Sequence, residues 1–200
     1  VYEPLRQNAQ SKTRTNELLK RPLEVFRCAV EPKEGVNPLR GGWGMSNFSG
    51  NYGSQPIPRW SDLDFLPGQV PSPTLVRRGA AQGVPPNGFF SVNSNVRIRD
   101  TTDGTSNTIM VGERSIIGRG GLWPGPRSNF HESDVVSDGS YASALNRSDT
   151  GFSSRHAQIV HFCFADGAVR AISSDIESKP EGGLFQHLCS RNGGEVVGEF

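Results

Sequence analysis

The sequence predicts an α+β fold, in which an antiparallel β-sheet carries short helices and long loops rich in glycine and proline. Glycine and proline number 24 and 14 among 200 residues, which is too many for a helical bundle. The apolar segments are short and rich in β-branched and aromatic residues, which is typical of strands. No strand pattern alternates with a long helical pattern, so parallel βαβ units are not expected.

The length and charge of the chain restrict its organisation and its partners. Two hundred residues suit one domain with long loops, and we treat residues 1–200 as a single globular unit. The net charge is +1 and no long run of one sign occurs, so long-range attraction to nucleic acid is not expected. No apolar stretch reaches the ~18 residues that would span a bilayer. Nothing within this chain therefore predicts a nucleic-acid partner or a membrane span.

The firmest local prediction is a β-hairpin near the C-terminus. Residues 158–165 are mostly apolar and form the first strand, and residues 168–173 form the second. Asp166 and Gly167 lie between them, and glycine accepts the positive φ that a tight turn requires. We expect antiparallel strands joined at this pair.

The first hairpin strand has two different faces because side chains alternate along a strand. Val160, Phe162 and Phe164 share the face that we assign to the core. The other face is mixed, and it contains His161 and Cys163. These two side chains could ligate zinc, but a structural zinc site needs about four ligands, so a half-buried strand histidine is the preferred interpretation.

The remaining elements are short and separated by loops. Short helices are expected within residues 3–20 and at 183–191, the second of them ended by Gly193 and Gly194. Strands are expected at 23–28, 48–53, 88–92 and 108–117, and Gly/Pro-rich loops at 29–46, 54–87 and 118–151.

His156 lies at the entrance to the hairpin. Ten steps of extended chain separate it from Asp166 by roughly 30 Å, so the two cannot form a catalytic pair on an unbroken strand. On such a strand His156 also points to the face opposite His161, unless a bulge intervenes. We expect a structural role for His156, with a general base or a metal ligand as the alternative.

A polar segment precedes the strand at 108–117. Its spacing does not fit an EF-hand, because Arg99 would stand at the first ligand position. Asp103 and Gly104 are expected to turn the chain. The side chains that follow them are expected to satisfy backbone groups of the loop, and they are Ser106, Asn107 and Thr108. Glu113 stands in an otherwise apolar strand, so its carboxylate should be paired, perhaps with an arginine, or act as a ligand.

Four segments carry a resemblance to a known family. His156 to Gly167 is similar to an H-x9-DG signature, and residues 98–113 resemble a DGTSNT…GE block. Residues 26–28 resemble an F-x-C-P-S-D segment, from which the sequence departs after Cys28, and residues 190–197 resemble the usual C-terminus. Together they resemble a bacterial family of unknown function with a prepilin-type N-terminal segment, related to pilins and pseudopilins.

The resemblance implies a pilin-like domain at the cell envelope, in the periplasm or on the surface. It implies that a membrane-anchoring helix and further sequence precede Val1, so that this chain is an ectodomain. It further implies a non-catalytic role in assembly, secretion or surface interaction, with other pilin-like or envelope proteins or with further copies of the chain as partners. Its motif residues are His156, Asp166, Gly167, Asp103, Gly104, Ser106, Asn107, Thr108 and Glu113.

No cofactor follows firmly from the sequence. Major pseudopilins of type II secretion bind calcium near C-terminal loops, so the resemblance makes a calcium site in a loop an expectation. The three cysteines, Cys28, Cys163 and Cys189, are read as small buried hydrophobes, and a bridge between the last two remains open.

Two alternative functions remain. A hydrolase or lyase would have a loop-built site near His156 and Glu113, although no nucleophile elbow or P-loop supports one. A carbohydrate-binding domain would use three tryptophans in predicted loops, Trp43, Trp60 and Trp123. We expect no enzyme activity, because the sequence contains no recognisable catalytic constellation.

Overall fold

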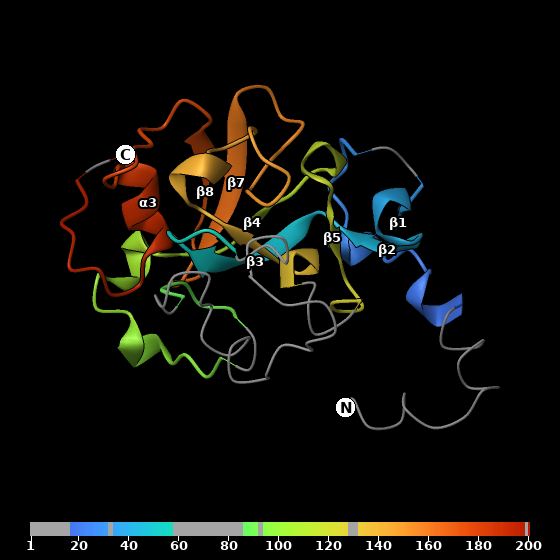
Figure 1. Ribbon diagram of the computed structural model, residues 1–200, viewed down its shortest axis with the longest axis horizontal. Coiled ribbons are helices and arrows are strands. Elements are labelled where there is room, and N and C mark those ends of the chain that lie inside the picture. Colours follow the sequence, from blue (N-terminus) through green and yellow to red (C-terminus); the bar gives the residue numbers. More distant parts are fainter. Residues whose placement is uncertain (1–16, 32–33, 58–85, 92–93, 128–131, 199) are drawn as a thin grey trace, which may run out of the picture.

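The computed structural model describes residues 17–31, 34–57, 86–91, 94–127, 132–198 and 200. Their strands form two sheets that lie side by side (Figure 1). The larger sheet has the order β6-β3-β4-β7-β8, and the smaller has the order β1-β2-β5. This arrangement confirms the α+β class with short helices. The sheets are antiparallel except for the β3–β6 pair, which is parallel.

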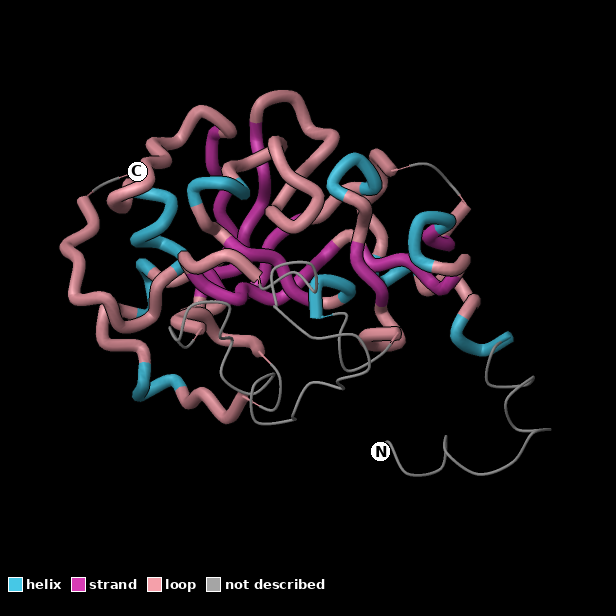
Figure 2. Tube along the Cα trace, viewed as in Figure 1, coloured by secondary structure: helices cyan, strands magenta, loops and turns pink. Residues whose placement is uncertain are grey.

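Strand lengths are short throughout, as Figure 2 shows. The larger sheet contains β3 (Phe48–Gly53), β4 (Ile109–Glu113), β6 (Val136–Asp138), β7 (Ile159–Phe164) and β8 (Val169–Ser173). The smaller contains β1 (Val36–Asn37), β2 (Trp43–Ser46) and β5 (Gly121–Leu122). The helical elements are α3 (Leu184–Cys189) and the 3-10 turns η2 (Glu24–Phe26), η3 (Pro38–Arg40), η5 (Ile98–Asp100), η6 (Thr105–Asn107), η7 (Ile116–Gly118), η8 (Glu132–Asp134) and η9 (Tyr141–Ser143).

The main core lies between the larger sheet and α3. Phe152 and Phe162 meet edge to face, with ring centroids 5.1 Å apart. Gly112 on β4 leaves room for them, because a Cβ there would lie 2.5 Å from both rings. The buried members of this core are Ile109, Leu145, Phe152, Val160, Phe162, Phe164, Ile172, Phe185, Leu188 and Cys189.

The predicted hairpin is confirmed. β7 pairs with β8 from Ile159 opposite Ser173 to Cys163 opposite Val169. Gly167 has a φ of 87°, and its N–H donates to Phe164 O. Along β7, Val160, Phe162 and Phe164 are buried while the alternate residues are partly exposed, as the strand period requires.

Several predicted boundaries are wrong. Residues 24–26 form a 3-10 turn rather than a strand, because Phe26 and Arg27 donate to Leu23 O and Glu24 O. Residues 88–91 are not a strand, although Gly88 and Phe90 donate to the backbone of β3. The strand expected at 108–117 ends at Glu113 and gives way to η7.

Further differences lie in the predicted loops and at the last helix. Segments 29–46 and 118–151 hold β1, β2, β5 and β6. The last helix is confirmed, but it ends at Cys189, before the two glycines, because the next residue, Ser190, is extended. Residues 17–19 are helical, whereas the rest of the helices expected within 3–20 and most of the excursion at 54–87 fall outside the described residues. No helix in the described part of the chain is long and apolar enough to cross a membrane.

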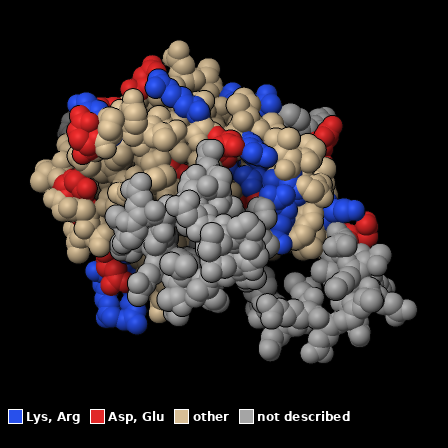
Figure 3. Space-filling view, in the orientation of Figure 1, with Lys and Arg blue, Asp and Glu red and all other residues tan. Residues whose placement is uncertain are grey.

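Buried charges lie where the two sheets meet. Arg114 is fully buried and donates to the backbone oxygens of Gly118, Ser133, Val136 and Asp149. Burial lowers the pKa of Arg114 to about 9, so the guanidinium is still charged at neutral pH. On the surface, Figure 3 shows basic side chains toward the end that carries the smaller sheet, with acidic ones among them.

Candidate metal centre

Three side chains that lie far apart in the sequence meet beside the larger sheet. The Sγ of Cys28 is 3.7 Å from Oε1 of Glu113 and 3.4 Å from Nε2 of His156. The same Nε2 is 3.5 Å from that carboxylate oxygen. Among the described residues these three form the one group whose ligand-type atoms lie within 4.8 Å of one another. Thiol, carboxylate and imidazole are all metal ligands, so the trio can hold an ion.

Glu113 is the last residue of β4, and its two oxygens have separate partners. Gly112 stands opposite Phe162 on β7, which places Glu113 next to His161. Oε2 accepts a hydrogen bond from the backbone N–H of His161 at 2.8 Å and lies 3.1 Å from the Nδ1 of its ring. Oε1 is thereby directed toward Cys28 and His156. The expectation that this carboxylate is paired is met by histidines and a thiol rather than by an arginine.

His156 reaches the group because the strand does not extend back to it. Gln158 has a φ of 58°, in the left-handed region, so the chain turns before β7 begins at Ile159. The rings of His156 and His161 consequently lie edge to face, with centroids 4.9 Å apart. The placement expected for an unbroken strand, on the opposite face, is therefore wrong.

Cys28 is positioned by Asn47, which lies between β2 and β3. The side-chain oxygen of Asn47 accepts the N–H of Cys28 at 2.9 Å, and its backbone oxygen accepts the N–H of Arg114 at 2.7 Å. Through its side chain and its backbone, the buried residue Asn47 thus holds the Cys28 segment against the end of β4. Burial raises the pKa of the Cys28 thiol, and the nearby Glu113 carboxylate adds to the shift.

Glu31 lies three residues beyond Cys28 and is also buried. Its backbone N–H donates to Cys28 O at 3.1 Å. Oε1 accepts the N–H of Ile116 at 3.3 Å and lies 3.5 Å from Nε of Arg155. Burial raises the pKa of this carboxyl group, while the hydrogen bond from Ile116 and the charge of Arg155 oppose the shift.

Hydrogen bonds join the loop at residues 103–108 to the C-terminal segment, and we call this place the second junction. The carboxylate of Asp103 accepts the N–H groups of Gly193 and Gly194 at 2.7 and 2.9 Å. Gly104 has a φ of 95°, and Thr108 Oγ1 donates to its carbonyl oxygen. Both Asp103 oxygens are therefore engaged with N–H donors of the C-terminal segment.

The turn of the hairpin belongs to that second junction. Asp166 N–H donates to Thr105 O at 3.1 Å, and the Asp166 carboxylate accepts the N–H of Ala168 at 2.8 Å. Asn107 Nδ2 donates to Asp103 O at 3.3 Å. The residues predicted from the resemblance thus separate into two places. His156 and Glu113 lie in the candidate metal centre, whereas the residues at this junction are Asp103, Gly104, Asn107, Thr108, Asp166 and Gly167. Ser106 lies on η6 beside them.

Two of the three predicted sugar-stacking tryptophans lie within the described residues. Trp123 stacks on Phe26 with ring centroids 6.3 Å apart and donates to Arg21 O at 2.8 Å. It therefore attaches the N-terminal segment to the body of the protein. Trp43 is half-buried in β2, and Trp60 lies outside the described residues.

The sequence predicts that Cys28 is a small buried hydrophobe, and it does not predict a role for Glu31 or Asn47. All three cysteines are free thiols, and only Cys189 is fully buried. The sequence does contain one indication of the site. Cys28, Glu113 and His156 each stand in a different one of the resembling segments, and each has a side chain that can bind a metal.

A family described as "Protein of unknown function (DUF1559)" matches residues 1–144 and 125–179. The chain belongs to this family. The match covers the segments that carry all three residues of the candidate metal centre. No curated protein and no solved structure matches the chain.

Proposed function

We propose that this DUF1559 chain is a zinc-binding domain of an envelope-exposed, pilin-like protein. The observation that carries the proposal is the spacing of Sγ of Cys28, Oε1 of Glu113 and Nε2 of His156. Zinc bonds of about 2.3 Å to sulfur and 2.0–2.1 Å to nitrogen and oxygen, at tetrahedral angles, separate the ligand atoms by about 3.4–3.6 Å. The three observed separations are 3.4, 3.5 and 3.7 Å.

The surroundings of Glu113 support the same conclusion. Ligating carboxylates in metal sites are themselves held by hydrogen bonds from outer residues. Here His161 holds Oε2 through its backbone N–H, with its ring nitrogen close by, and Oε1 is left to bind an ion. Sulfur, nitrogen and oxygen together suit zinc better than calcium or magnesium, which prefer oxygen ligands.

A thiol nucleophile is the competing use of the same three residues. Reactive cysteines have a lowered pKa, because the thiolate is the nucleophile. The pKa of Cys28 is instead raised by burial and by Glu113. A bound cation would reverse this effect by stabilising the thiolate, so the surroundings favour a metal over a free nucleophile.

The experiment is a zinc titration of the metal-free 200-residue chain by calorimetry. We expect one equivalent to bind, and Cys28→Ser, Glu113→Gln and His156→Asn each to weaken binding by at least about tenfold. Cys163→Ser is the matched control, because this thiol lies on β7 outside the group, and it should bind zinc as the parent does. Failure of the parent to bind zinc, or unchanged affinity in Cys28→Ser, would refute the proposal.

The envelope location and the pilin-like role rest on the resemblance of the four motif blocks. One feature of the fold favours association with other copies or with other pilin-like proteins. β8 is the outer strand of the larger sheet, and Val169 on it is 68% exposed. An open strand edge can pair with a strand of another chain. Fractionation of cells that express the whole gene product tests the location, and recovery in the cytosol would contradict it.

A further inference from the structure

Glu31 has a carboxylate oxygen that no group satisfies among the described residues. The side chain is 1% exposed, and its Oε2 is buried without a hydrogen-bond partner. Its other oxygen is held by Ile116 N–H and faces Arg155. A buried carboxylate oxygen without a partner has lost its hydrogen bonds to water and gained none in the protein, which destabilises the folded state. Such an atom in a native protein indicates a missing partner, such as a water or a ligand.

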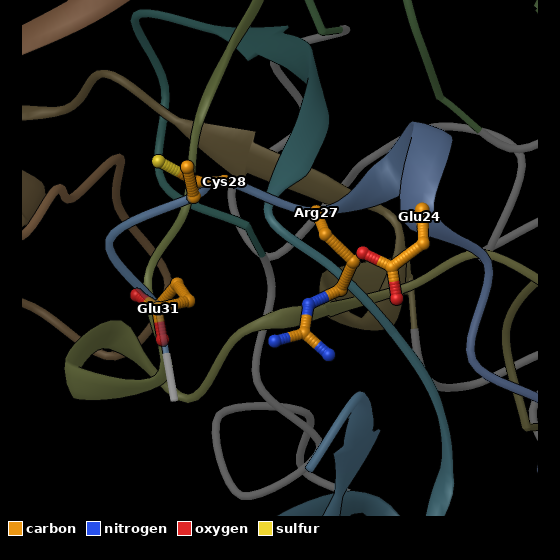
Figure 4. A pocket seen from close by; sticks show the side chains of 5 residues that line it. Glu24, Arg27, Cys28 and Glu31 are labelled. Carbon is orange, nitrogen blue, oxygen red and sulfur yellow. The ribbon is translucent and has the colours of Figure 1, made fainter. Parts of the chain in front are cut away.

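The position of Glu31 connects it to every segment of the metal centre. It follows Cys28 by three residues, Ile116 follows Glu113 by three, and Arg155 directly precedes His156. Cys28 and Glu31 also line one pocket of about 450 Å³, together with Glu24, Arg27 and Ala29. Figure 4 shows Cys28 and Glu31 on one side of this pocket and Glu24 on the other, with Arg27 between them.

Glu31 nevertheless lies outside the group of three ligand side chains. Among the described residues, the ligand-type atoms that lie within 4.8 Å of one another belong to Cys28, Glu113 and His156, and neither Glu31 nor His161 contributes one. Within the described part of the chain, an ion held by Cys28, Glu113 and His156 therefore has three protein ligands. Zinc sites with three protein ligands hold water in the fourth position and are typical of catalytic centres, whereas structural sites are closed by a fourth side chain.

We infer, on the basis of the zinc site proposed above, that Glu31 binds the water in the fourth position and that the centre hydrolyses carboxylic esters. In the step, the water gives one proton to Oε2 of Glu31 and its oxygen forms a bond to the ester carbonyl carbon. The bond from that carbon to the alkoxy oxygen then breaks. The departing alkoxide takes the proton from Glu31, which leaves a carboxylic acid and an alcohol.

The single ion determines the choice of substrate class. Phosphatases and nucleases commonly use two ions about 3.5–4 Å apart, and the described residues supply ligands for one. A single zinc with a carboxylate base is the arrangement that attacks carbonyl groups. Arg155, whose side chain is 36% exposed, adds a positive charge beside Glu31 where negative charge develops on the carbonyl oxygen.

The first experiment asks whether the fourth position is open. The chain is loaded with cobalt(II), whose absorption reports thiolate coordination, and azide is then added. We expect azide to change the cobalt bands, because it replaces the water. A spectrum with the thiolate band that does not respond to azide indicates a site closed by protein, and it would overturn this inference while leaving the zinc proposal intact.

The second experiment tests Glu31 directly. Hydrolysis of p-nitrophenyl acetate is measured with zinc-loaded protein, and the rate of the metal-free protein is subtracted. Glu31→Gln should keep zinc affinity and the azide response but lose roughly 100-fold of the zinc-dependent rate, since a general base contributes 10²–10⁴. Glu181→Gln removes the same charge at an exposed residue outside the pocket lining and should retain the rate. Equal rates in both variants, or no zinc-dependent rate in the parent, would overturn the assignment.

Discussion

The two oxygens of the Glu113 carboxylate have different surroundings, and this difference determines what the residue can do. Oε2 is fixed by the backbone and ring of His161, while Oε1 faces the thiol and the second imidazole. A carboxylate held in this way can bind an ion through one oxygen without losing orientation. In the proposed zinc site, His161 therefore positions the carboxylate of Glu113, which would bind the ion.

His161→Ala tests this role. The variant keeps the backbone N–H that binds Oε2 but loses the ring, so Glu113 should be less well oriented. We expect zinc affinity to fall by about 10–100-fold, as is usual when an outer residue of a metal site is removed. His187→Ala is the control, because His187 lies on α3 outside the group, and calorimetry should give it the parental affinity. Parental affinity in His161→Ala would show that the ring does not position Glu113.

The role of a residue can be predicted from the sequence when it depends on neighbouring residues in the chain. Glu113 is an example, because the apolar strand around it is enough to predict that its carboxylate needs a partner. The face of His156 could be predicted only for an unbroken strand, because the left-handed conformation of Gln158, which turns the chain before β7, is unusual for a residue other than glycine, asparagine or aspartate. Glu31 carries no local signal, since its burial results from contacts with Ile116 and Arg155.

At the scale of elements, the hairpin was predictable and the short strands were not. β7 and β8 are neighbours in the chain, and a turn residue with positive φ joins them. β6 and β1 contain three and two residues, and each pairs with a strand that sequence reasoning could not select. Strands of this length carry too few residues to show a period of two.

Gly167→Val tests the hairpin turn. A Cβ at Gly167 meets no atom within 4 Å, so the substitution adds no clash and its cost arises from the φ of 87°. A β-branched residue resists that conformation, and we expect the free energy of unfolding to fall by about 1–2 kcal/mol. Gly167→Asn should cost less, because asparagine tolerates positive φ. Urea denaturation measures both, and equal losses would mean that backbone conformation does not explain the glycine.

At the scale of the whole molecule, the candidate metal centre brings together residues that lie far apart in the chain. Cys28 is 85 residues from Glu113 and 128 residues from His156. Near the same place, Arg114 uses buried hydrogen bonds to gather the backbone around η7 and β6. The sheets meet at polar groups here, whereas the apolar core lies on the side of α3.

Zinc should therefore raise the stability of the whole chain. An ion that binds only the folded state stabilises it by about 2.7 kcal/mol when free zinc is 100 times its Kd. For a chain of this size each kcal/mol shifts Tm by about 2–4 °C, so we expect a rise of roughly 5–10 °C that EDTA reverses.

The pH dependence of this shift has a definite sign. The Cys28 thiol must lose its proton to bind zinc, and burial already raises its pKa in the metal-free protein. Protons therefore compete with the ion, and the zinc-induced rise in Tm should shrink as pH falls from about 7.5 to about 6. Cys28→Ser should show little rise at either pH, and Cys163→Ser should behave as the parent. A rise in Tm that persists in Cys28→Ser would mean that zinc stabilises the fold from some other place.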